Sequence, residues 1–598
     1  MTSSRSRTAR LLAASLMASV AITVYSAEAQ EKPRSLVPPL GQTPSQQTDS
    51  TSPASSTQTP PEQTKVIEGS RIKGAVVVQS LGGLDPASIG TLTASTGGFG
   101  PNMWQGTKPE RVVTLLKFLP IPSASPEMQR LFRRLLLTAA VIPQGLKQPL
   151  ELIKLRLDKL LEAGLVPDAA ELIARIPASS MSPDINRVAV ELNMLQGKNE
   201  EACRLADGSQ AVAEDNFWTK TDVFCNLISG NMARAEIGIN LLDETAGEDP
   251  LFFALFDRLA GGSSTLPEND QALTPLHFAM MSRAGAHLPY PDIEKAGYAF
   301  LWALATDEKA NINERFTAAY ESLGVGSIPP VLPRRLISAG AFTDGAEEVA
   351  DLGRIASLYR DAIAATDDLE KARILGELWT AGESDGSYLA ASSLTMPLLL
   401  QMTPADYGGA FELDALRLSL VAGEEQSAIA WERGVRRGAL KGDFAAREAA
   451  RKRIARASAY MLISGTSGIA RWNAATFDVA DLDHGDDVAQ TENVGLYLNV
   501  MEIFGEPVPE DLWSSALDLG QVPRLSLSNQ VIQRNLASAA AAGRVGETVA
   551  LALSALGEEG PGMVSTETLG SVLTALKTVG LEAEARQLAL EAAVSRNL

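Results

Sequence analysis

The sequence predicts an all-α fold, an α-solenoid of stacked helical hairpins, and three observations support this fold class. Three glycines recur at a spacing of 33 residues, and each ends an apolar helical stretch: Gly164, Gly197 and Gly230. An alanine follows five residues after each of them: Ala169, Ala202 and Ala235. Aromatic residues make up only 5% of the chain while alanine and leucine abound, a composition that favours helices over a β-sandwich.

The first 29 residues predict a secretory signal peptide. Three arginines among the first ten residues precede an apolar run from Leu11 to Val24, and Ala27 and Ala29 supply the small residues of a cleavage site. The apolar run is shorter than the roughly 20 residues that a membrane span takes. We therefore expect cleavage near Ala29, export to the periplasm, and no integral membrane segment in the mature chain.

Two further segments separate the signal from the helices. Residues 30–70 are rich in Pro, Ser, Thr and Gln, which predicts a disordered linker. Residues 71–108 form a glycine-rich, non-helical segment that begins with a β-like run, Ile72 to Leu81. Within Gly82 to Thr107, one interpretation makes Phe99, Met103 and Trp104 a docking element for a partner, because aromatic anchors are favoured at interfaces. The other makes the segment a cap that shields the open end of the solenoid.

From residue 109 to residue 598 helical periodicity dominates. The repeats are clearest at 150–244, 413–440 and 530–598, whereas the period is lost between about 251 and 410 although helical patterns continue there. Each hairpin of such a stack buries its apolar stripe against its neighbours. The length predicts a curved rod or superhelix with a long concave face.

The turn sequence GKNEEA at 197–202 resembles the turn between the two helices of a tetratricopeptide repeat. The glycine and alanine of this turn recur at Gly423 with Ala428 and at Gly580 with Ala585. After Gly543, threonine replaces the alanine. The order of signal, polar linker, GGFGPNMWQGT segment and alanine-rich hairpins is also similar to a group of exported helical-repeat proteins of alphaproteobacteria. Some of that group carry an antifreeze-glycopeptide label, which this chain does not support because it lacks an Ala-Ala-Thr tandem repeat.

The two cysteines, Cys203 and Cys225, both fall in the part predicted to be exported. In an oxidising compartment a cysteine pair is expected to form a disulfide. Cys203 would lie on the second helix of one hairpin and Cys225 on the first helix of the next, at equal distances from the turn between them. The alternative is two buried thiols, and a redox-active pair is disfavoured because there is no C-x-x-C spacing.

Several motifs match known chemistry without the context that this chemistry requires. The segment GESDG at 382–386 matches a serine-hydrolase motif, but that motif needs a preceding strand and here a helix is predicted. TPLHFA at 274–279 fits an ankyrin signature without a repeat 33 residues away, so a capped helix start is expected. The acidic run at 478–487 misses the calcium-loop spacing, and the chain has only three histidines, His277, His287 and His484. We predict no catalytic residues, no cofactor and no metal site.

The charge and the architecture favour a binding protein over an enzyme. A net charge of −20 gives no counterion release on nucleic acid, so nucleic acid is not an expected partner. The hypothesis is a non-catalytic periplasmic scaffold or adaptor that binds an envelope protein or peptide, with basic partners favoured. The alternative is an enzyme or enzyme accessory acting on cell-wall polymer, through a carboxylate-lined groove with acids such as Glu314 or Asp406.

Overall fold

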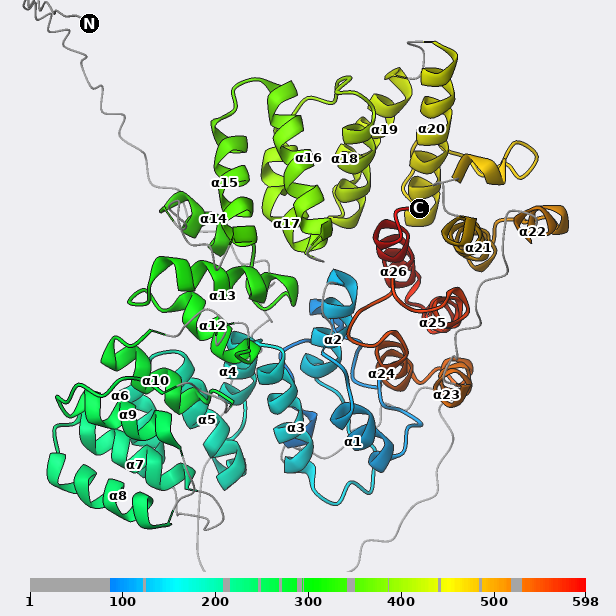
Figure 1. Cartoon of the computed structure of the whole chain (residues 1–598). Helices are drawn as coiled ribbons and strands as arrows, with labels where there is room; N and C mark the ends of the chain where they lie inside the picture. Colours follow the sequence, from blue (N-terminus) through cyan, green and yellow to red (C-terminus); the bar gives the residue numbers. More distant parts are fainter. Residues whose placement is uncertain are drawn as a thin grey trace, which may run out of the picture. The chain divides into compact units, whose positions relative to one another are not determined.

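The structure of this chain is a computed structural model (Figure 1). Its described part consists of helices and the segments that connect them. The described residues are 86–121, 125–207, 216–245, 249–267, 272–287, 293, 295–340, 350–384, 387–438, 443–482, 487–517 and 530–598. The chain divides into two units, Met1–Val78 and Gln79–Leu598, and every described residue belongs to the second. The predicted signal peptide, the linker at 30–70 and the β-like run at 72–81 lie outside the described residues.

The all-α prediction is confirmed: the described residues form 25 α-helices that pack in neighbouring pairs, without a β-strand. The helices up to residue 306 are α1 (Pro109–Lys117), α2 (Pro126–Leu137), α3 (Pro149–Glu162), α4 (Val166–Ala174), α5 (Pro183–Leu195), α6 (Asn199–Asp207), α7 (Phe217–Ile228), α8 (Met232–Thr245), α9 (Pro250–Leu259), α10 (Pro275–Ala284) and α12 (Tyr298–Thr306). They are followed by α13 (Ile312–Gly324), α14 (Val331–Ser338), α15 (Ala350–Ala364), α16 (Asp368–Ser384), α17 (Tyr388–Leu399), α18 (Ala410–Val421), α19 (Glu425–Gly438) and α20 (Phe444–Ser464).

The last α-helices are α21 (Asp487–Ile503), α22 (Glu510–Leu517), α23 (Gln530–Ala541), α24 (Val545–Leu556), α25 (Thr566–Thr578) and α26 (Glu582–Ser595). Short 3-10 helices are η1 (Pro86–Ser88), η2 (Ala94–Thr96), η3 (Ala178–Ser180) and η5 (Val479–Leu482). Among the described helices, none combines the length and the apolar character that crossing a bilayer takes.

The repeated glycines lie at the turns between paired helices. Gly164, Gly197 and Gly230 have φ of +71°, +69° and +79° and connect α3 to α4, α5 to α6, and α7 to α8. After Gly197, the N–H of Lys198 donates to the carbonyl of Asn193 at 2.8 Å, which closes the helix end as a left-handed cap does. Positive φ recurs at the other repeat glycines: Gly423, Gly543 and Gly580.

The residue five positions after each of these glycines is buried, as close packing of the returning helix requires. All six are 0% exposed: Ala169, Ala202, Ala235, Ala428, Thr548 and Ala585. At position 548 threonine replaces the alanine and is buried in the same way. Its hydroxyl donates to the carbonyl of Arg544 at 2.9 Å. A buried hydroxyl is tolerated when it is hydrogen-bonded.

The first and last described helices are neighbours. Helix α2 packs against α24 and α26, and α1 packs against α24. Helix α26 also packs against α18, α20, α21 and α25, so that nearly its whole circumference is covered. All residues from Leu588 to Val594 are buried, so the second half of α26 is enclosed on every side. In the expected curved rod or superhelix, the first and last helices would each leave one face open. In the described part of the chain, the first and last helices instead cover each other.

Candidate functional site

The predicted disulfide is present. Cys203 on α6 and Cys225 on α7 are bonded, with their Cα atoms 5.5 Å apart. The two helices belong to successive hairpins, as the sequence predicts, and residues 208–215 between them lie outside the described residues. These are the two cysteines of the chain, and their bond links the two hairpins.

The three residues proposed as partner anchors contact the chain itself. Met103 and Trp104 are 3% and 2% exposed, and the N–H of Gly546, at the start of α24, donates to the carbonyl of Met103 at 2.8 Å. A Cβ atom on Gly546 would lie 2.8 Å from the Trp104 ring, so this close approach requires glycine. Phe99 is half-buried, and the guanidinium of Arg134 lies 4.3 Å from its ring centre. A partner-binding role for these three residues stays a prediction.

The TPLHFA motif begins a capped helix, as expected. The Thr274 hydroxyl accepts from the N–H of His277 at 3.3 Å, and Nδ1 of His277 accepts from the N–H of Thr274 at 3.2 Å. The other ring nitrogen faces Asp249 at 3.2 Å, and Asp249 also accepts from Lys220 and from the N–H of Phe252. Burial opposes ionisation of Asp249, but hydrogen bonds from His277 and Lys220 outweigh it and hold its pKa below the ordinary value. Both nitrogens of this buried histidine are engaged in helix capping and pairing.

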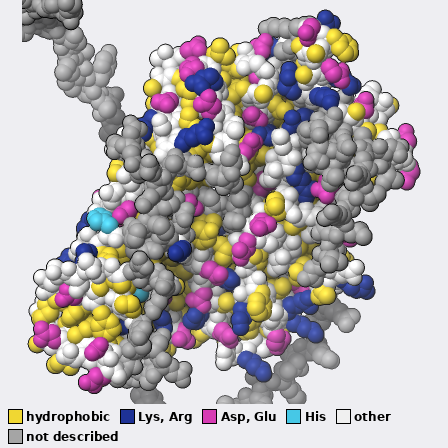
Figure 2. Space-filling model, in the orientation of Figure 1, with side chains coloured by type: hydrophobic (Ala, Val, Ile, Leu, Met, Phe, Trp, Pro, Cys, Tyr) yellow, Lys and Arg dark blue, Asp and Glu magenta, His cyan; other side chains and the backbone are white. Residues whose placement is uncertain are grey.

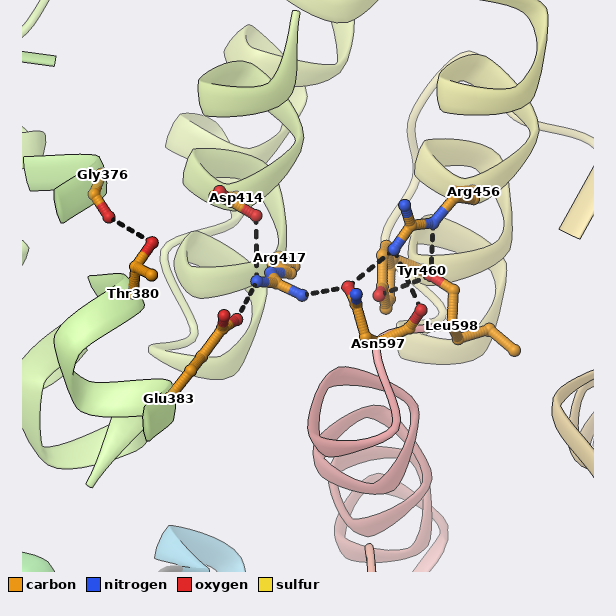
Figure 3. Close-up of polar contacts among 9 residues, drawn as sticks. All are labelled: Gly376, Thr380, Glu383, Asp414, Arg417, Arg456, Tyr460, Asn597 and Leu598. Atoms are coloured by element: carbon orange, nitrogen blue, oxygen red, sulfur yellow. Dashed lines mark hydrogen bonds and ion pairs between the residues drawn. The ribbon is translucent and has the colours of Figure 1, made fainter. Parts of the chain in front are cut away.

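A polar network joins α16, α18 and the residues after α26 (Figure 3). The buried guanidinium of Arg417 on α18 lies 2.9 Å from Glu383 and 3.0 Å from Asp414. It also donates to the side-chain oxygen of Asn597 at 2.8 Å. Glu383 belongs to the GESDG segment, which lies on the last turn of α16 up to Ser384, so a helix does precede that motif as predicted.

Helix α20 completes the network by binding main-chain oxygens. Arg456 donates to the carbonyl of Leu598 at 2.8 Å and to that of Asn597 at 3.0 Å, and the Tyr460 hydroxyl donates to Leu598 at 2.7 Å (Figure 3). The Leu598 side chain is 0% exposed. These contacts connect α20 to the residues that follow α26. The network therefore has a structural role.

A second network holds the first helices against the last ones. Glu547, at the start of α24, is 2% exposed and lies 3.0 Å from Arg111 on α1 and 2.7 Å from Arg544. The Thr107 hydroxyl donates to the same carboxylate at 3.2 Å. On α2, Arg134 lies 2.6 Å from Glu584 on α26. The C-terminal helices thus supply the carboxylates and the N-terminal segments supply the donors.

Two glutamates are buried at the centre of this contact. Glu591 on α26 accepts from the Ser125 hydroxyl at 2.5 Å and from the N–H of Glu127 at 2.9 Å. Burial raises the pKa of Glu591 to about 7 against the hydrogen bond from Ser125, and burial raises that of Glu127 to about 8 although Arg130 lies 2.9 Å away. We call this set the first–last junction: Thr107, Arg111, Ser125, Glu127 and Arg134 with Glu547, Glu584 and Glu591.

A groove lies between the α5–α6 turn, α10 and the end of α12. It is open to solvent, and a smaller pocket adjoins it. Groove and pocket share four lining residues and so form one depression: Phe278, Ser282, Asp307 and Lys309. The floor of the pocket is apolar and includes Met281, Leu304 and Phe300, whose ring meets that of Phe278 edge to face at 5.5 Å.

Carboxylates surround this depression. Asp307 accepts from the Ser282 hydroxyl at 2.5 Å and from the N–H of Lys309 at 3.0 Å. Glu314, on the first turn of α13, lies 3.2 Å from Nδ1 of His287, and burial raises its pKa although that hydrogen bond opposes the shift. The depression can therefore hold a ligand that has an apolar part and hydrogen-bond donors.

The remaining sequence candidates lie elsewhere. Asp406, the other acid considered for an enzyme, lies in the loop before α18, and residues 483–486 of the acidic run at 478–487 lie outside the described residues. Within the described residues no group of three His, Cys, Asp or Glu side chains is placed to hold a metal ion. The groove itself was not predicted, because its residues come from four separate segments, three of which lie in the region without a regular repeat. The only sequence signal was Glu314, which could not be ranked among many acids.

No protein-family model, curated protein or solved structure matches this chain. The case for a function therefore depends on the residues and the geometry alone.

Proposed function

We propose that this chain is an exported, non-catalytic helical-repeat scaffold that binds an envelope protein or peptide in the groove between the α5–α6 turn, α10 and α12. The observation that carries the proposal is the depression itself, an apolar pocket that opens into a polar groove. Concave sites with an apolar floor and a few polar groups are the usual form of ligand sites. The predicted signal peptide supports a periplasmic location for this scaffold, and the predicted polar linker supports its reach.

The proposal uses the groove rather than the segment that contains Phe99, Met103 and Trp104. Two of those side chains are buried against the chain's own α24, whereas groove residues such as Glu308 and Lys309 are exposed. A partner can therefore reach the groove without displacing a helix. The paired helices around it give the site a fixed frame, as repeat proteins do for extended ligands.

Site-specific photo-cross-linking in cells tests this function. A photoreactive phenylalanine analogue would replace Glu308 in the groove and, as a control, Glu425 on the first turn of α19, which is also exposed. We expect one envelope protein to be captured in stoichiometric amount from position 308 and not from position 425. Equal capture from both positions, or none from 308, would exclude the groove as the binding site. Capture of cell-wall fragments at 308 would replace the scaffold with the cell-wall enzyme.

A further inference from the structure

We infer that the occupant of this groove is a basic peptide, whose lysine or arginine side chain enters the pocket beside Asp307 and Glu314; this inference rests on the proposed function. The pocket and the groove form one depression. Its shape and its charge each restrict the chemistry of the ligand.

The shape fits a long side chain with an apolar stem. The floor is formed by the rings of Phe278 and Phe300 together with Met281 and Leu304, and all four side chains are buried. Lysine and arginine bury their methylene stems on such surfaces while the charged head stays at a polar rim. An aromatic ring below a cation adds a favourable electrostatic contact.

The charge of the lining favours a cation at that rim. Four carboxylates line the depression: Glu200, Asp307, Glu308 and Glu314. Two cations, Arg283 and Lys309, oppose them, and His287 lies 3.2 Å from Glu314. Over the face of the molecule shown in Figure 2, by comparison, acidic and basic side chains are interspersed. A cleft lined mainly by one sign of charge raises the local concentration of ligands of the opposite sign.

An acidic peptide is disfavoured here, because it would add carboxylates to a site in which carboxylates already outnumber the basic side chains.

Fluorescence anisotropy of the purified full chain with three labelled peptides tests the inference. The peptides are acetylated, amidated octamers of alternating alanine with arginine, glutamine or glutamate. We expect the arginine peptide to bind and the other two to bind at least tenfold more weakly. Binding should weaken between 50 and 500 mM NaCl, because salt screens charge contacts.

Variants that remove either carboxylates or a cation from the groove distinguish the contribution of charge to binding from that of shape. The double variant Glu308→Gln/Glu314→Gln should bind the arginine peptide about fivefold more weakly, since each partly exposed charge pair contributes little on its own. Lys309→Gln should bind it more tightly, because a repelling cation is removed. The matched control is Glu425→Gln, which removes a carboxylate from the first turn of another helix and should leave binding unchanged. Circular dichroism of each variant identifies any loss of fold.

The outcomes also separate this inference from the proposed function. If cross-linking at position 308 captures a partner but the arginine peptide does not compete with it, the groove binds a partner of other chemistry and the basic-peptide inference is wrong. If neither position 308 nor position 425 captures a partner, the proposed scaffold function itself is contradicted. If Lys309→Gln weakens arginine-peptide binding, the attraction is not electrostatic and the inference is overturned.

Discussion

The α6–α7 pair and the first–last junction hold the chain together in opposite ways. At α6 and α7 a disulfide joins residues 22 positions apart, and the helices next to it pack as local pairs. At the junction no covalent bond exists, and Glu591 meets residues 464 and 466 positions away through buried hydrogen bonds. The first contact depends on the redox state of the compartment, whereas the second depends on packing and on protons.

This difference shows where each region can open. Breaking the disulfide changes the chain locally, because a disulfide acts mainly by restricting the opened state of its own loop. Breaking the junction exposes buried carboxylates and the close contact of Trp104 with Gly546. Since unpaired buried charge is costly, the junction is expected to open as a unit rather than residue by residue.

The largest effect is expected from Trp104→Ala. Removing a buried tryptophan side chain costs about 3–5 kcal/mol, and Trp104 is 2% exposed against α24. Hydrogen exchange followed by mass spectrometry should show faster exchange in α24, α1 and α2. The matched control is Trp379→Ala on α16, which is equally buried and stacks on Phe411, and which should speed exchange around α16 and α18 instead. The same exchange pattern from both variants would mean that the junction is not a separate unit.

The next effect is expected at the disulfide. The double variant Cys203→Ser/Cys225→Ser should lower the local free energy of opening by about 3 kcal/mol, as for a loop of this order of length. Faster exchange should appear in α6, α7 and α8, while α2 and α26 keep the wild-type rate. Adding a reductant should reproduce this pattern in the wild type and change nothing in the double variant. If the reductant also accelerated exchange in α26, the two regions would be coupled.

The sequence was sufficient for the local contacts and not for the distant ones. Gly197 with Ala202 predicted a turn and a buried position, and Thr274 with Pro275 predicted a capped helix start, because each signal lies within one turn of a helix. The cysteine pair was predicted because both cysteines fall in the part expected to be exported and would lie on neighbouring helices.

The junction and the groove required the structure. The apolar residues of α26 are not gathered on one face, so helical periodicity does not tell which side α2 covers. The sequence does not single out Glu591 among 72 acidic residues, although it is 1% exposed. The groove likewise joins Glu200 to Glu314 across segments whose packing no repeat pattern specified.

A smaller effect is expected from pH at the junction. The folded-state pKa values of Glu591 and Glu127, about 7 and about 8, lie above the ordinary 4.5, so the closed junction holds protons that the opened chain releases. This contribution to stability is full below about pH 4.5 and is lost as pH rises through 7 and 8. Glu591→Gln should slow exchange in α26 relative to wild type by about 2 kcal/mol more at pH 8.5 than at pH 5.5, because the cost of ionising the buried carboxylate grows over this range. Glu425→Gln serves as the control at both pH values, and each comparison is made at matched pH because intrinsic exchange depends on it. Faster exchange of Glu591→Gln than of wild type at pH 8.5 would mean that the hydrogen bonds from Ser125 and Glu127 stabilise the ionised carboxylate.

The smallest effect is expected from substitution of a turn glycine, and the prediction concerns whether the substitution stabilises or destabilises its helix pair. Gly197 has φ of +69° with open space around it, so Gly197→Ala costs about 1 kcal/mol through backbone conformation alone. Gly353, inside α15, also has open space but no positive φ, so Gly353→Ala should stabilise its helix by about 0.5–1 kcal/mol. Exchange rates in α5 and α6 for the first variant, and in α15 for the second, should therefore move in opposite directions. If both substitutions stabilised, the left-handed turns would not be what fixes the helix pairs. Because neither substitution touches the disulfide or the junction, this pair also measures how far a purely local change spreads between the two regions.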